Sequence, residues 1–328
     1  MTNSSSRPPG EFELIARLFA PLARSAPGAF GLVDDAAVVR ALPGKDLVVT
    51  VDALVEGVHF LSGDPAGQIA KKALRVNLSD LAAKGAEPVG YLLALVLPKS
   101  VTMDWLGAFA KGLAEDQAEF ALPLLGGDTT ATSGPLTISI TAFGQVPAGG
   151  MIRRAGAKPG ESVFVSGTVG DAGGGLERLK MEARAGANDP LVARYRLPAP
   201  RLTLGASLRG VASAGLDVPD GLLADLGHIA EVSQVRIVVE AAAIPRSPAL
   251  RALWGETPQA ILRAATAGDD YELAFTAPQS MRSAVAKAAA RAGVAVAEIG
   301  RVEAGQGVCL MDDRGHEIEV ARAGYAHF

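Results

Sequence analysis

Apolar runs alternate with amphipathic stretches along most of the chain, a pattern typical of packed strands and helices. Residues 11–24 carry apolar side chains at helical spacing and predict an amphipathic helix. The run DLVVTVDALV predicts a buried strand that ends near Asp52, and residues 66–85 predict a helix. A second buried strand at 91–98 and a second helix at 103–120 are expected to follow.

The chain changes character after residue 146, where Gly and Pro cluster in PAGGMIRRAGAKPGE. Just before this cluster, LTISITAFGQV alternates strictly and predicts a half-buried strand. After it, SVFVSG predicts a strand, TVGDAGGGL a glycine-rich loop that opens a helix, and strands and helices continue to alternate up to a final hairpin. Because 328 residues exceed what one core usually supports, we expect two α/β or α+β domains. The expected division is a flexible N-terminus at 1–10, an N-terminal domain at 11–148 and a C-terminal domain at 149–328.

Composition narrows the class of protein. The net charge is −4, and Lys and Arg are scattered, which argues against nucleic acid as a partner. Cys309 is the only cysteine, so no intrachain disulfide can form and a reducing compartment is expected. The longest strongly apolar run, YLLALVLP, is too short to span a bilayer. We therefore expect a cytoplasmic protein with no membrane partner.

Aspartates gather near the ends of the predicted strands and helices, where loops form sites in α/β folds. They are Asp34 and Asp35 in GLVDDAAVV, Asp52 in VTVDALVEGVHF, Asp80 in VNLSDLAAKG, Asp128 in LLGGDTT, Asp217 and Asp220 in LDVPDGLLADLGH, and Asp269 and Asp270 in AGDDYEL. Each also has a structural explanation. A turn explains the first pair, turn chemistry explains Asp128, and a helix N-cap explains Asp220. A solvated helix face shared with Asn77 and Lys84 explains Asp80.

The number of these acids and their apolar flanks favour a shared site, because acids that converge in a cleft need a cation. Oxygen ligands without a His or Cys cluster select Mg²⁺. Gly126 and Gly127 allow a bulky anion to approach the backbone, and the hydroxyls of Thr129 and Thr130 can donate to it. The chain has no GxxxxGK[ST] motif, and SGTVGDAGGGL fails the GxGxxG spacing, so it offers only a generic anion-binding arrangement. The pattern predicts a magnesium–phosphate site.

Several long motifs, in order along nearly the whole chain, resemble those of the thiamine-monophosphate kinases. They are GEFELIARL, DDAAVV, VDALVEGVHF, KALRVNLSDLAAKGAEP, LLGGDTT, RAGAKPGE, DGLLADLGH, GDDYEL and GYAHF. This family belongs to a superfamily with aminoimidazole ribonucleotide synthetase and selenophosphate synthetase. The resemblance implies a two-domain synthetase-superfamily α/β fold, with N-terminal domains that pair into a homodimer through a shared β-barrel. It also implies an ATP- and Mg²⁺-dependent conversion of thiamine monophosphate to thiamine diphosphate.

The resemblance further implies roles for individual residues. The positions that match metal ligands are Asp35, Thr50, Asp52, Asp80, Asp128, Asp217 and Asp220. Those that match nucleotide contacts are Gly127, Asp128, Arg154 and Pro219, and those that match substrate contacts are His59, Asp269 and Tyr325. Tyr325 offers an aromatic face to the cationic thiazolium. Arg154 and Asp128 are the expected catalytic residues, because transfer to a phosphate that is already largely ionised at pH 7 needs positioning and charge more than a general base.

Three positions depart from the family pattern. Val33 replaces a glycine of GIGDD, Val51 replaces a threonine, and Pro219 replaces the serine of DxSDGL, which removes a hydroxyl and a backbone N–H. Two alternatives stay open at this point. One is another ATP-dependent synthetase of the superfamily, although selenide chemistry would call for a reactive Cys near the N-terminus. The other is a nucleotide-binding regulator without catalysis.

Overall fold

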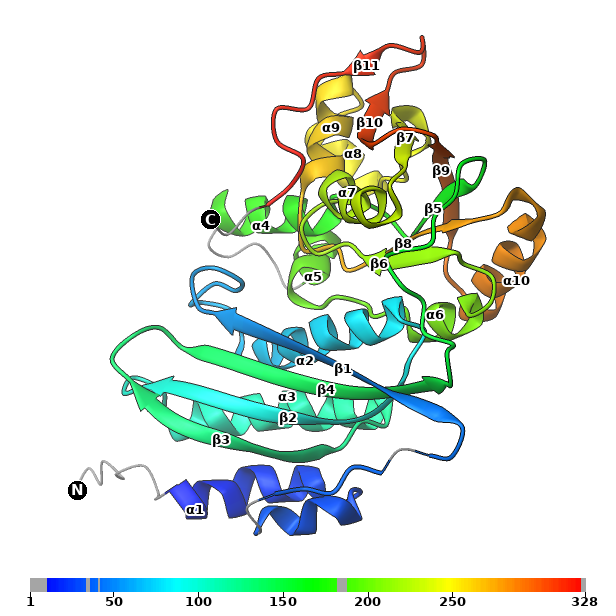
Figure 1. Ribbon diagram of the computed structural model, residues 1–328. Coiled ribbons are helices and arrows are strands. Elements are labelled where there is room, and N and C mark those ends of the chain that lie inside the picture. The colour runs from blue at the N-terminus through cyan, green and yellow to red at the C-terminus, as the bar shows by residue number, and fades with distance from the viewer. Residues whose placement is uncertain (1–10, 34–35, 41, 182–187, 326–328) are drawn as a thin grey trace. The chain divides into compact units, whose positions relative to one another are not determined.

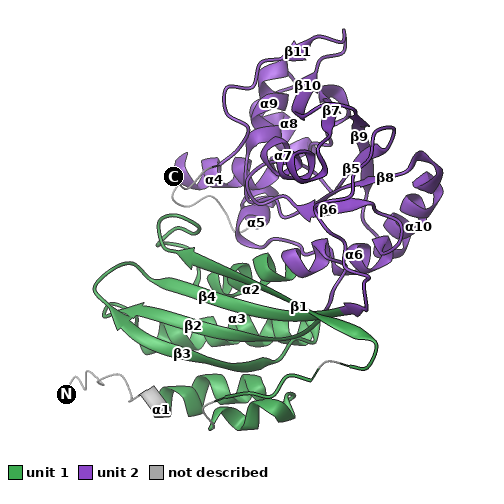
Figure 2. Ribbon diagram, viewed as in Figure 1, with its two compact units in different colours: residues 1–78, 88–145 green, residues 79–87, 146–328 purple. Residues whose placement is uncertain are grey.

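The computed structural model describes residues 11–33, 36–40, 42–181 and 188–325. The chain divides into two compact units, each described here by itself (Figure 2). Unit 1 comprises residues 1–78 and 88–145, and unit 2 comprises residues 79–87 and 146–328. The short segment 79–87 is thus separated in sequence from the rest of unit 2, which a division at residue 148 does not anticipate.

Unit 1 is built on a four-stranded sheet with the order β1-β4-β2-β3, one face of which is covered by α2 and α3 (Figure 1). Its elements are α1 (Glu11–Leu14), β1 (Lys45–Val55), α2 (Ala66–Ala83, whose last turns belong to unit 2), β2 (Glu87–Pro98), α3 (Met103–Phe120), β3 (Leu124–Thr132) and β4 (Thr137–Pro147). Buried side chains alternate with half-buried ones along β4, as the sequence pattern predicts for a strand with one covered face. The predicted strand at 91–98 and the predicted helices at 66–85 and 103–120 are confirmed as β2, α2 and α3.

The N-terminal segment departs from the predicted helix over residues 11–24. The α-helix ends at Leu14, a π-helical turn covers Ile15–Phe19, and 3-10 turns follow at Ala20–Ala23 and Pro27–Leu32. Pro21 has no N–H to continue an α-helical ladder, so the apolar spacing is kept while the helix type changes. The 3-10 turns contact β3, and their alanines pack with Leu125 in a small apolar cluster.

Unit 2 is built on a seven-stranded mixed sheet with the order β11-β10-β7-β9-β5-β8-β6. Its strands are β5 (Ser162–Ser166), β6 (Ala214–Asp217), β7 (Arg236–Glu240), β8 (Leu273–Ala277), β9 (Val296–Glu303), β10 (Gly307–Met311) and β11 (Glu317–Ile318). Its helices are α4 (Asp171–Met181), α5 (Pro190–Arg196), α6 (Leu202–Leu208), α7 (Leu222–Ser233), α8 (Pro248–Trp254), α9 (Pro258–Thr266) and α10 (Arg282–Ala292), with 3-10 turns at Ala241–Ala243 and Gln279–Met281.

The sheet of unit 2 is buried on both faces. On β5, Val163 and Val165 pack with the buried leucines of α7, while Phe164 between them packs with Phe275 and the apolar side chains of α6 and α10. The second cluster also holds Ala82 and Ala83, although they are distant in sequence. Two-sided burial explains why the strands of this half read as continuous apolar runs rather than as alternating ones. The predicted C-terminal hairpin is confirmed as the antiparallel pair β10 and β11.

Candidate functional site

The loop that follows β6 is the centre of the candidate site in unit 2. Asp217 is the last residue of β6 and pairs with Leu273 of β8. Three backbone hydrogen bonds continue this pairing beyond the strands: Val218 N donates to Glu272 O (2.9 Å), Tyr271 N to Val218 O (3.0 Å) and Asp269 N to Pro219 O (2.7 Å). The DVPD and GDDYEL motifs therefore lie side by side, so Asp217 and Asp269 belong to one part of unit 2.

The C-terminal GYAHF motif joins the same loop, because Tyr325 N donates to Asp220 O at 2.9 Å. Two glycines permit these close approaches. A Cβ at Gly268 would stand 2.7 Å from Pro219 O, and one at Gly324 would stand 2.5 Å from Asp220 O. The structure thus gathers Asp217, Asp220, Asp269 and Tyr325 from three separate motifs.

The end of α2 and the turn after it supply a fourth segment of unit 2, with Asp80 in the last turn of the helix and Lys84 directly after the helix. Lys84 Nζ donates to Gly215 O at 3.0 Å, next to β6. Burial lowers the pKa of Lys84, the carboxylates of Asp217 and Asp80 act in the opposite direction, and Arg154 lowers it further. These influences place Asp217, Asp80 and Arg154 each within electrostatic reach of Lys84. The exposed Arg154 is carried by the loop between β4 and β5.

The solvated-face explanation of Asp80 is wrong for its neighbours on the helix. Asn77 is fully buried, and burial dominates the pKa of Lys84. Asn77 Nδ2 donates to Ala73 O, while its Oδ1 has no hydrogen-bond partner in the part of the chain that the structure describes. A buried orphan oxygen is costly unless something else satisfies it.

The N-cap explanation of Asp220 is also wrong. Helix α7 begins at Leu222, its N-cap is Gly221, and no side chain caps it from that position. The buried carboxylate of Asp225 instead accepts hydrogen bonds from Asp220 N and Gly221 N, both at 3.1 Å. Burial raises the pKa of Asp225 to about 8, and the charges of Asp220 and Asp217 add to the rise. The side chain of Asp220 is thereby left for another role.

The glycine-rich loop before α4 does not offer the open anion site that its sequence indicates. The fully buried carboxylate of Asp270 accepts hydrogen bonds from Gly170 N (2.5 Å) and Ala172 N (3.1 Å) at the start of this helix. The anion at this helix end is therefore a side chain of the protein itself. Burial raises the pKa of Asp270 to about 8, although both backbone hydrogen bonds and Arg194 oppose the rise.

A buried ion-pair network fixes the other end of the GDDYEL segment. The carboxylate of Glu272, almost fully buried, pairs with Arg194 at 2.7 Å and with Arg201, and it accepts from Ser166 Oγ at 2.6 Å. Arg194 also donates to Asp270 O at 3.0 Å. In the same segment, the backbones of Asp269 and Tyr271 adopt left-handed conformations, with φ of 70° and 51°. Such backbone is strained for residues other than glycine and persists where the surroundings hold it.

Unit 1 carries the remaining candidates on its sheet. Thr50 and Asp52 lie within β1, on the same face as the buried Val48 and Leu54. Asp128 lies within β3, in register with Ala94 of β2, rather than in a turn after a double glycine. Since β1 and β3 are the two edges of this sheet, three strand spacings of about 4.8 Å separate Asp52 from Asp128 along it.

Two further candidates of unit 1 have local roles. A Cβ at Gly127 would overlap Leu93 O of the neighbouring strand, so close strand packing already requires glycine there. His59 Nδ1 accepts from Val55 N at 3.0 Å, which leaves Nε2 as the protonated nitrogen of the neutral ring and a hydrogen-bond donor. Asp34 and Asp35, the pair that opens the aspartate series, lie outside the described residues.

The oxygen donors fit magnesium by their chemistry. Among the described residues, no three His, Cys, Asp or Glu side chains converge as a ready-made metal cage. Magnesium does not need one, because it is commonly held by one or two carboxylates together with the phosphates of a nucleotide and water. The orphan Oδ1 of Asn77, one turn before Asp80 on α2, is a further hard donor.

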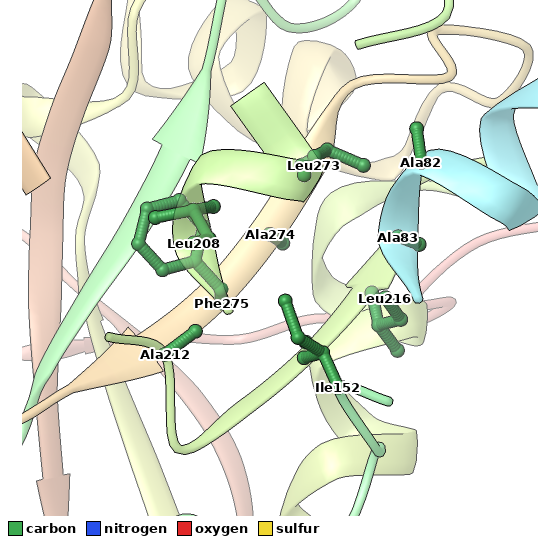
Figure 3. A pocket seen from close by; sticks show the side chains of 11 residues that line it. Ala82, Ala83, Ile152, Leu208, Ala212, Leu216, Leu273, Ala274 and Phe275 are labelled. Carbon is green, nitrogen blue, oxygen red and sulfur yellow. The ribbon is translucent and has the colours of Figure 1, made fainter. Parts of the chain in front are cut away.

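A small internal cavity in unit 2 is not the substrate site. It has a volume of about 10 Å³, roughly the space of one water molecule. Apolar side chains, among them Ile152, Leu208 and Phe275, surround it (Figure 3).

No helix in the described part of the chain is long and apolar enough to cross a membrane.

Two family models match successive parts of the chain. The AIR synthase related protein N-terminal domain matches residues 33–146, and the C-terminal domain matches residues 158–313. The thiamine-monophosphate kinase of Caulobacter vibrioides is 46% identical over 326 residues, which cover 98% of this chain and 92% of the relative. The chain belongs to the thiamine-monophosphate kinase family. The mixed α/β two-domain fold expected from the sequence is thereby confirmed.

Two solved structures extend the comparison with the family. The thiamine-monophosphate kinase of Stenotrophomonas maltophilia K279a is 44% identical, with a TM-score of 0.79, 85% of this chain covered and 89% of that one. AaThiL complexed with AMPPCP and TMP is 32% identical, with a TM-score of 0.78, 92% of this chain covered and 97% of that one.

In this member of the thiamine-monophosphate kinase family, the sequence reasoning missed the buried acids Asp225 and Glu272, and it missed the structural roles of Asp270 and Lys84. Two of them had a readable signal. Asp225 stands among the leucines of GLLADLGHIA, and Glu272 stands at the start of the apolar strand YELAFTA. An acid inside an apolar run is rarely placed there without a specific partner.

Proposed function

We propose that this protein transfers the γ-phosphoryl group of ATP to thiamine monophosphate and forms thiamine diphosphate. One observation carries the proposal: backbone hydrogen bonds join the DVPD loop to the GDDYEL segment and to Tyr325. The chain in which they do so is 46% identical to a thiamine-monophosphate kinase. The AaThiL complex with AMPPCP and TMP supports both substrates.

Transfer proceeds directly between the two substrates. An oxygen of the thiamine phosphate attacks the γ-phosphorus of ATP, the bond to the β,γ-bridging oxygen breaks, and ADP leaves. Because the second pKa of a phosphate monoester is about 6, the attacking oxygen is mostly ionised at pH 7 and needs no strong base. The task of the protein is to hold two anions in line against their mutual repulsion. Arg154, an exposed cation within electrostatic reach of Lys84, is suited to the transferring phosphoryl group.

The proposed magnesium ligands are Asp35, Thr50, Asp52, Asp80, Asp128, Asp217 and Asp220. Mg²⁺ held by these residues would supply positive charge that offsets the negative charge of the carboxylates and of the phosphates. Asp217 and Asp220 bring that charge next to Asp269, whose backbone is hydrogen-bonded to the same loop. Gly127, Asp128, Arg154 and Pro219 are the proposed nucleotide contacts.

The proposed substrate contacts are His59, Asp269 and Tyr325. The tautomer of His59 supports a donor role toward the substrate. Tyr325 is half exposed, and its backbone N–H donates to the backbone carbonyl of Asp220, a proposed metal ligand. An accessible aromatic face suits the cationic thiazolium ring.

We further propose that the protein is a cytoplasmic homodimer, in which residues 11–148 pair into a shared β-barrel and bind ATP and Mg²⁺. Leu47, Val49 and Val51 alternate along the edge strand β1 and are 39, 53 and 61% exposed. These side chains lie on the face of the sheet opposite the buried Val48 and Leu54, and an exposed apolar row of this kind favours an interaction surface. A second copy of the same sheet would cover it.

The test of function is to incubate the purified protein with MgATP and thiamine monophosphate and to separate the products by chromatography. Thiamine diphosphate and ADP are expected in equal amounts, with no phosphorylated protein. ATP binding in calorimetry without thiamine diphosphate would contradict the kinase and support the regulator, an alternative favoured by Pro219, which lacks a backbone N–H in the central loop. A product formed only from another acceptor would favour a neighbouring synthetase chemistry.

A further inference from the structure

We propose that Lys84 is a resident cation of the site, whose ammonium group neutralises part of the charge of Asp217 and Asp80 and so weakens the uptake of divalent ions there. This inference rests on the proposed function, which assigns those two carboxylates to Mg²⁺. It adds a residue for which the sequence favours only a solvated surface position.

The position of Lys84 is fixed by the fold. The residue directly follows α2, its N–H donates to Asp80 O of the last helical turn at 3.1 Å, and segment 79–87 is part of unit 2 together with β6 and the following loop. Its Nζ donates to Gly215 O at 3.0 Å, two residues before Asp217. Its own carbonyl accepts from Ile152 N at 3.2 Å, so the backbone is held as well. Because both the side-chain ammonium and the backbone of Lys84 are hydrogen-bonded, the ammonium is held in place and does not move freely in solvent as that of a surface lysine does.

The charges around Lys84 define what it does. The carboxylates of Asp217 and Asp80 favour its charged form, while burial and Arg154 oppose it. The ammonium has three N–H groups, of which one reaches Gly215 O, and the other two have no hydrogen-bond acceptor among the described residues. A group with this geometry attracts carboxylate or phosphate oxygens and repels a second cation.

The size of the effect follows from electrostatics. A divalent ion bound to Asp217 or Asp80 would stand within several ångströms of the ammonium, in surroundings that screen charge less than bulk water does. Removing one positive charge at such a distance should strengthen divalent binding by roughly tenfold or more, after allowance for water that enters the space. Lysine thus sets the affinity so that the ion binds well only when nucleotide phosphates contribute.

The test measures divalent binding to the substrate-free protein. Mn²⁺ is titrated into the full chain and free Mn²⁺ is followed by electron paramagnetic resonance, for wild type, Lys84→Met and Lys84→Arg. Lys84→Met keeps the length and apolar stem of the side chain and removes the charge, so its Mn²⁺ dissociation constant should fall about tenfold or more. Lys84→Arg keeps the charge and should stay within about twofold of wild type. Lys111→Met removes an exposed lysine from α3 and serves as the matched control, with no change expected.

Unchanged or weaker Mn²⁺ binding by Lys84→Met, with a circular dichroism spectrum like that of wild type, would overturn the proposal. If this variant fails to fold, Lys84→Gln replaces it, and the same result is decisive. The kinase assay on wild type is read separately. Formation of thiamine diphosphate by wild type, together with unaltered Mn²⁺ binding by Lys84→Met, rejects the role of Lys84 and keeps the proposed function. Tighter Mn²⁺ binding by Lys84→Met than by wild type, together with a wild type that forms no thiamine diphosphate, keeps the role of Lys84 and rejects the proposed function.

Discussion

Replacement of Glu272 by leucine would test whether the buried ion-pair network holds unit 2 together. The substitution introduces an apolar side chain of similar size and removes the carboxylate that pairs with Arg194 and Arg201. Both arginine side chains are only 19% exposed, so their charges would remain largely buried without their shared counterion. Ser166 Oγ would lose its acceptor as well.

The expected loss can be estimated from these contacts. Breaking a buried ion pair by removing one partner costs about 3–5 kcal/mol, because it leaves an uncompensated charge. This is a large fraction of the 5–15 kcal/mol by which folded proteins are typically stable. For a unit of this size it corresponds to a fall in melting temperature of about 6–20 °C. Glu272→Gln keeps the shape and one acceptor oxygen and should cost clearly less.

The assay is urea and thermal denaturation followed by circular dichroism. The matched control is Glu298→Gln, which breaks a pair with Arg282 at the surface, where both side chains are at least one-third exposed. Exposed pairs contribute about 0–1 kcal/mol, so this variant should melt close to wild type. If Glu272→Leu were destabilised no more than Glu298→Gln, the network would not stabilise unit 2, and the reasoning from burial would be refuted.

Three further predictions concern charge, catalysis and assembly. The pKa of Asp225 is about 8 in the folded protein and 3.8 in the unfolded chain, so the free energy of unfolding in EDTA should fall as the pH rises between these values. In denaturant titrations, Asp225→Asn should reduce this dependence on pH. A slope unchanged in the variant would contradict the raised pKa. Asp52→Asn and Asp128→Asn should each lower turnover by orders of magnitude while the circular dichroism spectrum stays unchanged, and wild-type rates in both would show that these acids hold no catalytic metal. Val49→Asp combined with Val51→Asp should yield monomers in sedimentation velocity, and a persistent dimer would place the interface elsewhere.

The regular elements could be predicted because they obey local rules. Helices α2 and α3 have clear apolar periodicity, and β2 is an uninterrupted apolar run. Strand β3 was not anticipated, because LLGGDTTAT has two glycines and a polar second half, and it is a strand through its pairing with β2. The helix predicted over residues 11–24 is α-helical only to Leu14, and the later turns contain Pro21, whose missing N–H the apolar periodicity does not reveal.

The candidate site could be predicted as a set of residue types but not as an arrangement. The pairing of Asp217 with Leu273 joins residues more than fifty positions apart, and no local pattern indicates it. The burial of Asp225 and Asp270 likewise depends on which backbone N–H groups the fold leaves for them. A carboxylate reads the same in a sequence whether it faces water, a metal or a helix end.

Because residues 79–87, which include the end of α2, belong to unit 2, a cut near residue 148 does not separate the chain into two complete domains. A fragment that starts at residue 149 would lack Ala82 and Ala83, which pack in the core of that half, and would uncover the backbone of Gly205, where only glycine can meet Ala82 O. Gene fusion or exchange of the second half with that of a relative would have to carry residues 79–87 along.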